Sequence, residues 1–117
     1  MDAEQATAVR TRHWHRPGKR AVVVTDLSHL HGPVSGTVVL PHWLYWSPAG
    51  HTWDLDDPEQ TRSMYEHVLN NVVEASDLTS YLNAATLAAI WPELWLPKGL
   101  RTAWEEYHPQ LRAVAAV

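Results

Sequence analysis

The junction at Asp57 and Pro58 divides the chain into two parts with different hydrophobic periods, and this change constrains the fold more than any other feature. Before it lie short β-branched runs separated by turn residues, which is the pattern of strands. After it, apolar residues recur at helical spacing. Strands followed by helices predict an α+β fold. We expect a small antiparallel sheet of three strands, followed by three to four helices that pack on one face.

The strands are predicted from three β-rich runs. The first covers residues 21–28, where "AVVVTDL" precedes the turn-forming segment "HGPVSG". The second is "GTVVLPHWLYWS", in which Pro41 indicates an edge position or a bulge. "SPAG" at residues 47–50 then predicts a type I turn into a third strand at residues 51–55. The last two runs are therefore expected to form a hairpin.

The helices are predicted from caps and prolines. Asp57 is expected to cap a helix over residues 58–75, with Pro58 at its first position. Ser76 or Asp77 is expected to cap a short second helix, which contains Leu78, Tyr81 and Leu82, and Asn83 is expected to cap a third. A last helix is expected to begin at Pro97 and to end before Pro109.

Length and composition favour one soluble domain. The chain has 117 residues and no cysteine, so disulfides and thiolate metal sites are excluded. No apolar run has the length of a membrane span, and no secretory signal is apparent, so we expect a cytoplasmic protein that does not enter a membrane. Residues 21–112 are expected to form a single α+β domain, followed by a C-terminal tail at residues 113–117.

The net charge of −4 conceals an asymmetry. Residues 1–20 carry five basic residues against Asp2 and Glu4, a balance of +3, and the remainder carries four basic against eleven acidic residues, a balance of −7. We expect residues 1–20 to be a disordered basic arm. One alternative function uses this arm to bind nucleic acid. The basic residues are Arg10, Arg12, Arg16, Lys19 and Arg20.

The hairpin has two faces with different expected roles. If Ser47 lies opposite His51, one face is wholly apolar and is expected in the core, as is Trp104 on the last helix. The residues of this face are Val39, Trp43, Tyr45, Trp53 and Leu55. The other face is too apolar for a solvated sheet, so it is either a contact surface or covered by the arm or a helix. Its candidate partner-binding residues are His42, Leu44, Trp46 and Asp54.

A metal site is the second alternative. His29 and His31 are two residues apart, which places both on one side of a strand, and Asp54 could supply a carboxylate. Such an open site could activate water in a metal-dependent hydrolase or nuclease. The glycine-rich and nucleophile motifs of other enzyme classes are absent from the sequence.

Residues 26–112 resemble a group of small uncharacterised proteins of GC-rich bacteria. The resemblance rests on "LHGPVSGTVVLP", on "DLDDPEQTRSMYEHVL", and on the signature formed by Trp91-Pro92-Glu93-Leu94, Leu96-Pro97 and Ala103-Trp104-Glu105. The group is associated with gene neighbourhoods of nucleotidyltransferase-type toxins and their antitoxins. The resemblance implies an antitoxin-like or regulatory binding role and carries over no catalytic residue.

Together these features favour a non-enzymatic protein-binding function, antitoxin-like or that of an accessory regulator, without a cofactor. The acidic body suits a basic, toxin-like protein partner. Self-association, the metal-dependent enzyme and the nucleic-acid accessory are the alternatives.

Overall fold

The computed structural model describes the backbone of residues 8–116 and the side chains of residues 8–112. Within this part the fold is α+β, as expected, with five α-helices, two 3-10 helices and four strands. In chain order the elements are β1 (Ala8–Arg16), β2 (Lys19–Val24), η2 (Leu27–His29), β3 (Thr37–Val38), β4 (Trp53–Asp54), α1 (Pro58–Asn71), α2 (Ala75–Thr79), α3 (Ala84–Ile90), η3 (Trp91–Glu93), α4 (Lys98–Tyr107) and α5 (Pro109–Ala116). The predicted three-stranded sheet is wrong, because the strands form two separate antiparallel pairs, β1 with β2 and β3 with β4.

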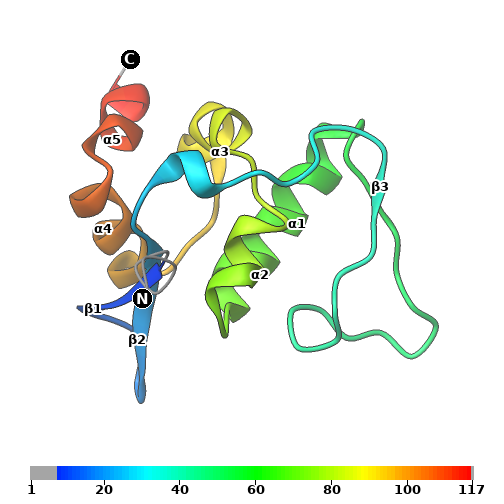
Figure 1. Ribbon diagram of the computed structural model, residues 1–117, viewed down its shortest axis with the longest axis horizontal. Coiled ribbons are helices and arrows are strands. Elements are labelled where there is room, and N and C mark those ends of the chain that lie inside the picture. Colours follow the sequence, from blue (N-terminus) through cyan, green and yellow to red (C-terminus); the bar gives the residue numbers. More distant parts are fainter. Residues whose placement is uncertain (1–7, 117) are drawn as a thin grey trace, which may run out of the picture.

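The two strand pairs lie on opposite sides of the molecule. The β1–β2 hairpin lies beside α4, and the long β3–β4 connection extends from the other side, with α1, α2 and α3 between them (Figure 1). No helix in the described residues is long and apolar enough to cross a membrane.

The first hairpin corrects the expectation of a disordered arm. From Ala8 onward the arm is β1, which pairs with β2 across a turn at Pro17 and Gly18, where Gly18 has φ +82°. Pro followed by a residue with positive φ is the pattern of a type II turn. β1 buries Thr11 and His15, whereas its arginines are exposed. Because the buried residues of β1 are polar, its sequence lacks the alternation of apolar and polar residues that predicts a strand with one face in the core. Residues 1–7 lie outside the described part.

The first predicted strand is also shorter than expected. β2 ends at Val24, and the chain continues into η2, where the Asp26 side chain accepts a hydrogen bond from the Ser28 amide at 2.9 Å. His29 therefore ends a 3-10 helix and does not lie on a strand.

The second hairpin has a different register from the predicted one. β3 pairs with β4 through Val38 opposite Trp53, so residues 39–52 form a long connection. The SPAG turn is confirmed, because the Gly50 amide donates to the Ser47 carbonyl at 3.0 Å and Gly50 has φ +78°. The strand expected before it is replaced by a single helical turn, in which the amides of residues 44 and 45 both donate to the Pro41 carbonyl.

This helical turn changes the exposure of several residues on the two expected faces. The turn directs Leu44 inward, and Leu44 and the preceding Leu40 are both buried. Trp43, predicted as core, is 45% exposed, and Val39 is exposed as well. Trp53 and Trp104 are buried, as expected.

Capping residues set the starts of α1 and α3. The Asp57 side chain accepts a hydrogen bond from the Glu59 amide at 3.0 Å, and the Asn83 side chain accepts one from the Thr86 amide at 3.1 Å. Both predicted caps are confirmed. α1 ends at Asn71, four residues earlier than expected, and the N-cap of α2 is Glu74 in place of the expected Ser76 or Asp77.

The C-terminal helices depart from the prediction at Pro109. Proline is well tolerated at the first position of a helix, and here it begins α5. The helix runs to Ala116, so the expected tail at residues 113–116 is helical in its backbone, and Val117 lies outside the described part. α4 packs against both strands of the first hairpin.

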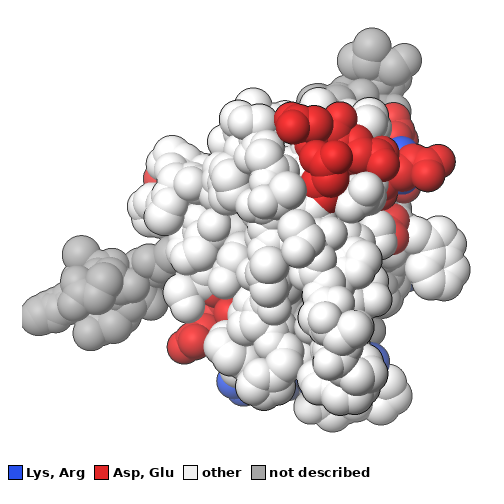
Figure 2. All heavy atoms as spheres, turned by 90° about the vertical axis from the view of Figure 1, so that its right-hand side faces the viewer, with Lys and Arg blue, Asp and Glu red and all other residues white. Residues whose placement is uncertain are grey.

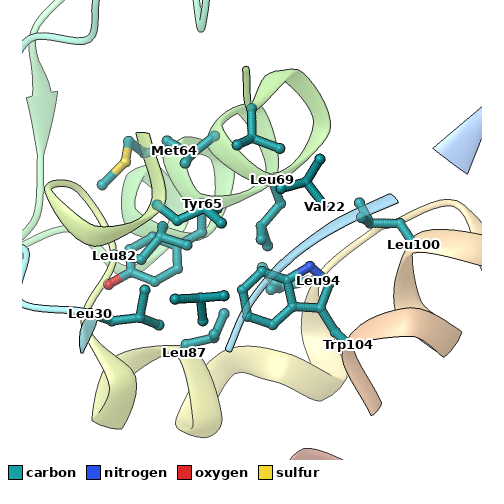
Figure 3. Close-up of a cluster of buried hydrophobic side chains, with 14 of the residues drawn as sticks. Val22, Leu30, Met64, Tyr65, Leu69, Leu82, Leu87, Leu94, Leu100 and Trp104 are labelled. Carbon is teal, nitrogen blue, oxygen red and sulfur yellow. The ribbon is translucent and has the colours of Figure 1, made fainter. Parts of the chain in front are cut away.

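One hydrophobic core joins the helices to β2. Side chains from α1, α3 and α4 converge on Val22 and its neighbours in β2 (Figure 3). Trp104 of α4 and Tyr65 of α1 are fully buried within it. The core therefore anchors β2 of the first hairpin to the helices.

Candidate functional site

An open groove of about 480 Å³ lies between the first hairpin and the end of α1. Its floor is apolar, formed by Val22, Val72 and Val73, and basic side chains surround it. The cations that line it are Arg10, Arg16, Lys19 and Arg20. We call this site the basic groove.

An exposed tryptophan lies in the basic groove. Trp14 is 54% exposed, and the guanidinium carbon of Arg20 lies 4.7 Å from the centre of its ring. The two residues are cross-strand partners in the β1–β2 pair, which keeps the side chains adjacent. Stacking by Arg20 occupies one face of the indole.

The backbone of Trp14 is held by α4. Gly99 lies so close to β1 that a β-carbon there would collide with the Trp14 carbonyl. Glycine is therefore required at this helix position, although it lowers helix propensity. The close approach fixes the point from which the indole projects.

The cations of the groove form no ion pairs with carboxylates in the part of the chain that the structure describes. Within residues 8–112, no aspartate or glutamate forms an ion pair with any of the four. Arg16 donates a hydrogen bond to the Asn70 carbonyl at 3.4 Å. Arg12 belongs to a different surface, because it lies 3.8 Å from the Glu106 carboxylate on α4.

The site predicted for nucleic acid is thus assembled only in part. Four of the five basic residues line the groove, and Arg12 does not. The sequence prediction missed Trp14 and the valine floor. The Pro17-Gly18 pair was a signal that could have revealed the hairpin, since it is typical of a tight turn between two strands.

Burial and neighbouring positive charges both change the pKa of Lys19. Burial lowers the pKa of its ammonium below the usual value, and the nearby guanidinium groups of Arg16 and Arg10 lower it further. Asp77 acts in the opposite direction. An anion bound in the groove would relieve this repulsion.

Asp77 is buried, and its oxygens already have donors. Oδ2 accepts hydrogen bonds from the amides of Val73 and Glu74, at 2.9 and 3.1 Å, and Oδ1 accepts one from the Trp43 indole at 3.0 Å. This carboxylate therefore organises the backbone at the edge of the groove and links it to the β3–β4 connection.

His15 supports the groove from the inner face of β1. Its Nε2 lies 3.1 Å from Oδ1 of Asn70, and Asn70 uses its amide nitrogen to donate to the Glu66 carbonyl. Oδ1 is thus the acceptor, so Nε2 carries the proton. Burial lowers the pKa of His15, and nearby Lys19 and Arg16 lower it further.

A second surface lies on the β3–β4 connection. Trp46 is 67% exposed and borders a pocket of about 220 Å³, together with Val39, His42 and His51. Most of this face is uncharged, with acidic side chains gathered at its upper edge and basic ones only at its margins (Figure 2). We call this surface the aromatic loop face.

The four predicted partner-binding residues divide between this face and the interior. His42 and Trp46 border the same pocket, as expected. Leu44 is only 1% exposed and packs in the core, because the helical turn directs it inward. Asp54 lies in β4, where its side chain accepts a hydrogen bond from the Asp56 amide at 2.9 Å.

The structure does not bring the three candidate metal ligands together. His29, His31 and Asp54 all belong to the described residues, and no group of three or more potential ligands there could hold a metal ion. Because residues 27–29 form a 3-10 helix and His31 bridges to Asn83, the two histidines do not share one side of a strand.

Aromatic rings fix the loop that carries Trp46. The ring of Tyr45 lies 5.1 Å from Trp53 and 4.6 Å from His67 of α1, and His51 lies 4.3 Å from Trp53, all measured between ring centres. Burial lowers the pKa of His67, and His51 lowers it further. These contacts hold the connection against α1.

The chain was compared with family models, curated proteins and solved structures, and no match was found in any of the three.

Proposed function

We propose that this protein binds nucleic acid, with the basic groove as its contact surface. The observation that carries the proposal is a set of four cations that form no ion pair with a carboxylate within residues 8–112 and that line one groove with an exposed tryptophan. Cations of this kind bind phosphates, and the aromatic ring offers a surface for a base. The role is that of a binding protein and not of an enzyme.

The location of the positive charge favours binding at the groove over nonspecific attraction by the whole chain. The chain as a whole has a net charge of −4, so its average field repels nucleic acid. Binding therefore depends on the local groove. Removing charge from the groove is expected to weaken binding far more than removing charge elsewhere.

Arg16→Gln and Lys19→Gln test the proposal by fluorescence anisotropy with a labelled oligonucleotide. Each phosphate contact contributes on the order of 1 kcal/mol, so the double variant is expected to bind at least about tenfold more weakly. Arg112→Gln is the matched control, since it removes one exposed arginine outside the groove. Equal losses in the groove variant and the control would contradict the proposal.

The same experiment distinguishes nucleic acid from an acidic protein. Polyglutamate supplies negative charge without bases or phosphates. If it displaces the oligonucleotide at equal concentrations of charge, the groove is a general polyanion site and the nucleic-acid proposal fails.

A protein partner at the aromatic loop face is the second candidate function. Its support is the exposed Trp46 beside a pocket on a face with few charges. This candidate corresponds to the antitoxin-like role that the sequence resemblance implies. Trp46→Ala is expected to leave the melting temperature nearly unchanged and to abolish partner association in pull-downs from the host. A large drop in melting temperature would assign Trp46 a structural role.

A further inference from the structure

We infer that the ligand of the basic groove is a single strand, one of whose unpaired bases stacks on Trp14 while neighbouring phosphates contact the groove's cations. The inference rests on the proposed function and adds the class of nucleic acid. It follows from the position of an exposed indole within the ring of charge, and not from the charge alone.

The first step concerns the two faces of the indole. Arg20 covers one face at 4.7 Å, and the ring remains 54% exposed. A planar base can stack on the open side, so that base, indole and guanidinium form three layers. The guanidinium favours this arrangement because it holds the ring through a cation–π contact.

The second step excludes a continuous duplex. Within a duplex, both faces of every internal base are covered by neighbouring base pairs, so only the two terminal pairs have a face available to Trp14. Every unpaired base has an available face whatever its identity. The groove is therefore suited to a single strand, with little preference for sequence.

The third step concerns preorganisation. Gly99 packs against the Trp14 carbonyl, and the buried valines of the groove are Val22 of β2 and Val72, which caps the end of α1. The indole therefore projects from a strand backbone that α4 holds in place. Binding thus requires little ordering of the protein, which favours affinity.

The test compares a labelled thymidine single strand with a blunt duplex of the same length, about 12 nucleotides, which is within the range of single-strand site sizes. Trp14→Ala is expected to weaken single-strand binding about 5- to 140-fold and to leave duplex binding unchanged. Trp14→Phe is expected to restore most of the affinity, and Trp14→Leu, which is apolar but not aromatic, is not. Inorganic polyphosphate, which has no bases, is expected to bind Trp14→Ala as well as the parent.

Trp46→Ala is the matched control, because it removes an exposed indole from the β3–β4 connection, which lies on the other side of the molecule from the first hairpin. Melting temperatures verify that each variant is folded. If Trp14→Ala binds the single strand as tightly as the parent while Arg16→Gln and Lys19→Gln bind it weakly, the proposed function stands and the stacking inference is overturned. If neither nucleic acid binds the parent protein, both fail.

Discussion

At the scale of single residues, Asp77 connects the two surfaces of the molecule. Its carboxylate accepts hydrogen bonds from two backbone amides at the edge of the basic groove and from the Trp43 indole of the aromatic loop face. The side chain is only 2% exposed, so water cannot replace these acceptors without a local rearrangement.

Asp77→Ala is expected to lower the free energy of unfolding by about 3 kcal/mol, because it leaves buried amide donors without an acceptor. Urea denaturation followed by circular dichroism measures this loss. Asp56→Ala is the control, since it removes an exposed carboxylate just before the start of α1, and it is expected to change stability by less than about 0.5 kcal/mol. Similar values for the two variants would refute the role given to Asp77.

At the scale of elements, the contact between α4 and β1 determines the position of the groove. Gly99 allows the helix to approach the strand at Trp14, and the same helix places Trp104 in the core. The hairpin is thus a fixed part of the fold, although its outer surface is strongly basic.

Gly99→Ala is expected to destabilise the protein and to weaken binding in the groove, because the new β-carbon displaces α4 from the Trp14 backbone. Helix propensity alone predicts the opposite result, which is that Gly99→Ala raises the free energy of unfolding by up to about 1 kcal/mol. Thermal unfolding of Gly99→Ala beside Lys98→Ala, an exposed neighbour in the same turn, separates the two effects. A raised melting temperature for Gly99→Ala would show that the close contact is not needed.

Element starts were the features that local sequence predicted best. Asp57 and Asn83 act as caps through their own side chains, and the Ser47–Gly50 turn depends on Gly50 with positive φ, so each is encoded by a few adjacent residues. The existence of helices over residues 58–71 and 98–107 also followed from the sequence, because their apolar spacing is regular.

The failures arose where tertiary contacts determine local structure. β1 was missed because its buried residues, Thr11 and His15, are polar and owe their burial to α4 and α1. The register of the second hairpin failed because the Pro41 carbonyl accepts two hydrogen bonds and curls the chain into a helical turn. The groove depends on both the hairpin and α1, so charge composition indicated its cations but not the Trp14 platform.

At the scale of the whole molecule, three histidines couple stability to pH. Burial lowers the pKa of His15, His67 and His108 below the usual value of 6.5. The unfolded chain therefore takes up protons at these positions before the folded protein does as the pH falls. Their contribution to stability is fully present above about pH 6.5 and is lost as the pH falls through the lowered folded-state values.

The melting temperature is accordingly expected to fall between about pH 7.5 and pH 5.5. The carboxylates Asp26 and Glu106, whose pKa values are also lowered, lose their contributions only at more acidic pH, so the two effects occur in separate ranges. Calorimetry at constant ionic strength measures the dependence. A melting temperature that is constant or rises over this range would contradict it.

Charged side chains are also distributed unevenly over the surface of the molecule. The basic groove lies on the side of the first hairpin, and the opposite side presents a mostly uncharged face with acidic groups at its edge (Figure 2). If the groove binds nucleic acid as proposed, the ligand would lie on the side away from this face.

The salt dependence of oligonucleotide binding tests the central claim most directly. Four cations that contact phosphates of a single strand predict a slope of about −2.8 for the logarithm of the binding constant against the logarithm of salt concentration, from roughly −0.7 for each contact. The double variant Arg16→Gln and Lys19→Gln is expected to reduce the slope to about −1.4, and Arg112→Gln is expected to leave it unchanged. A slope near zero, or one that the groove substitutions do not alter, would contradict the account.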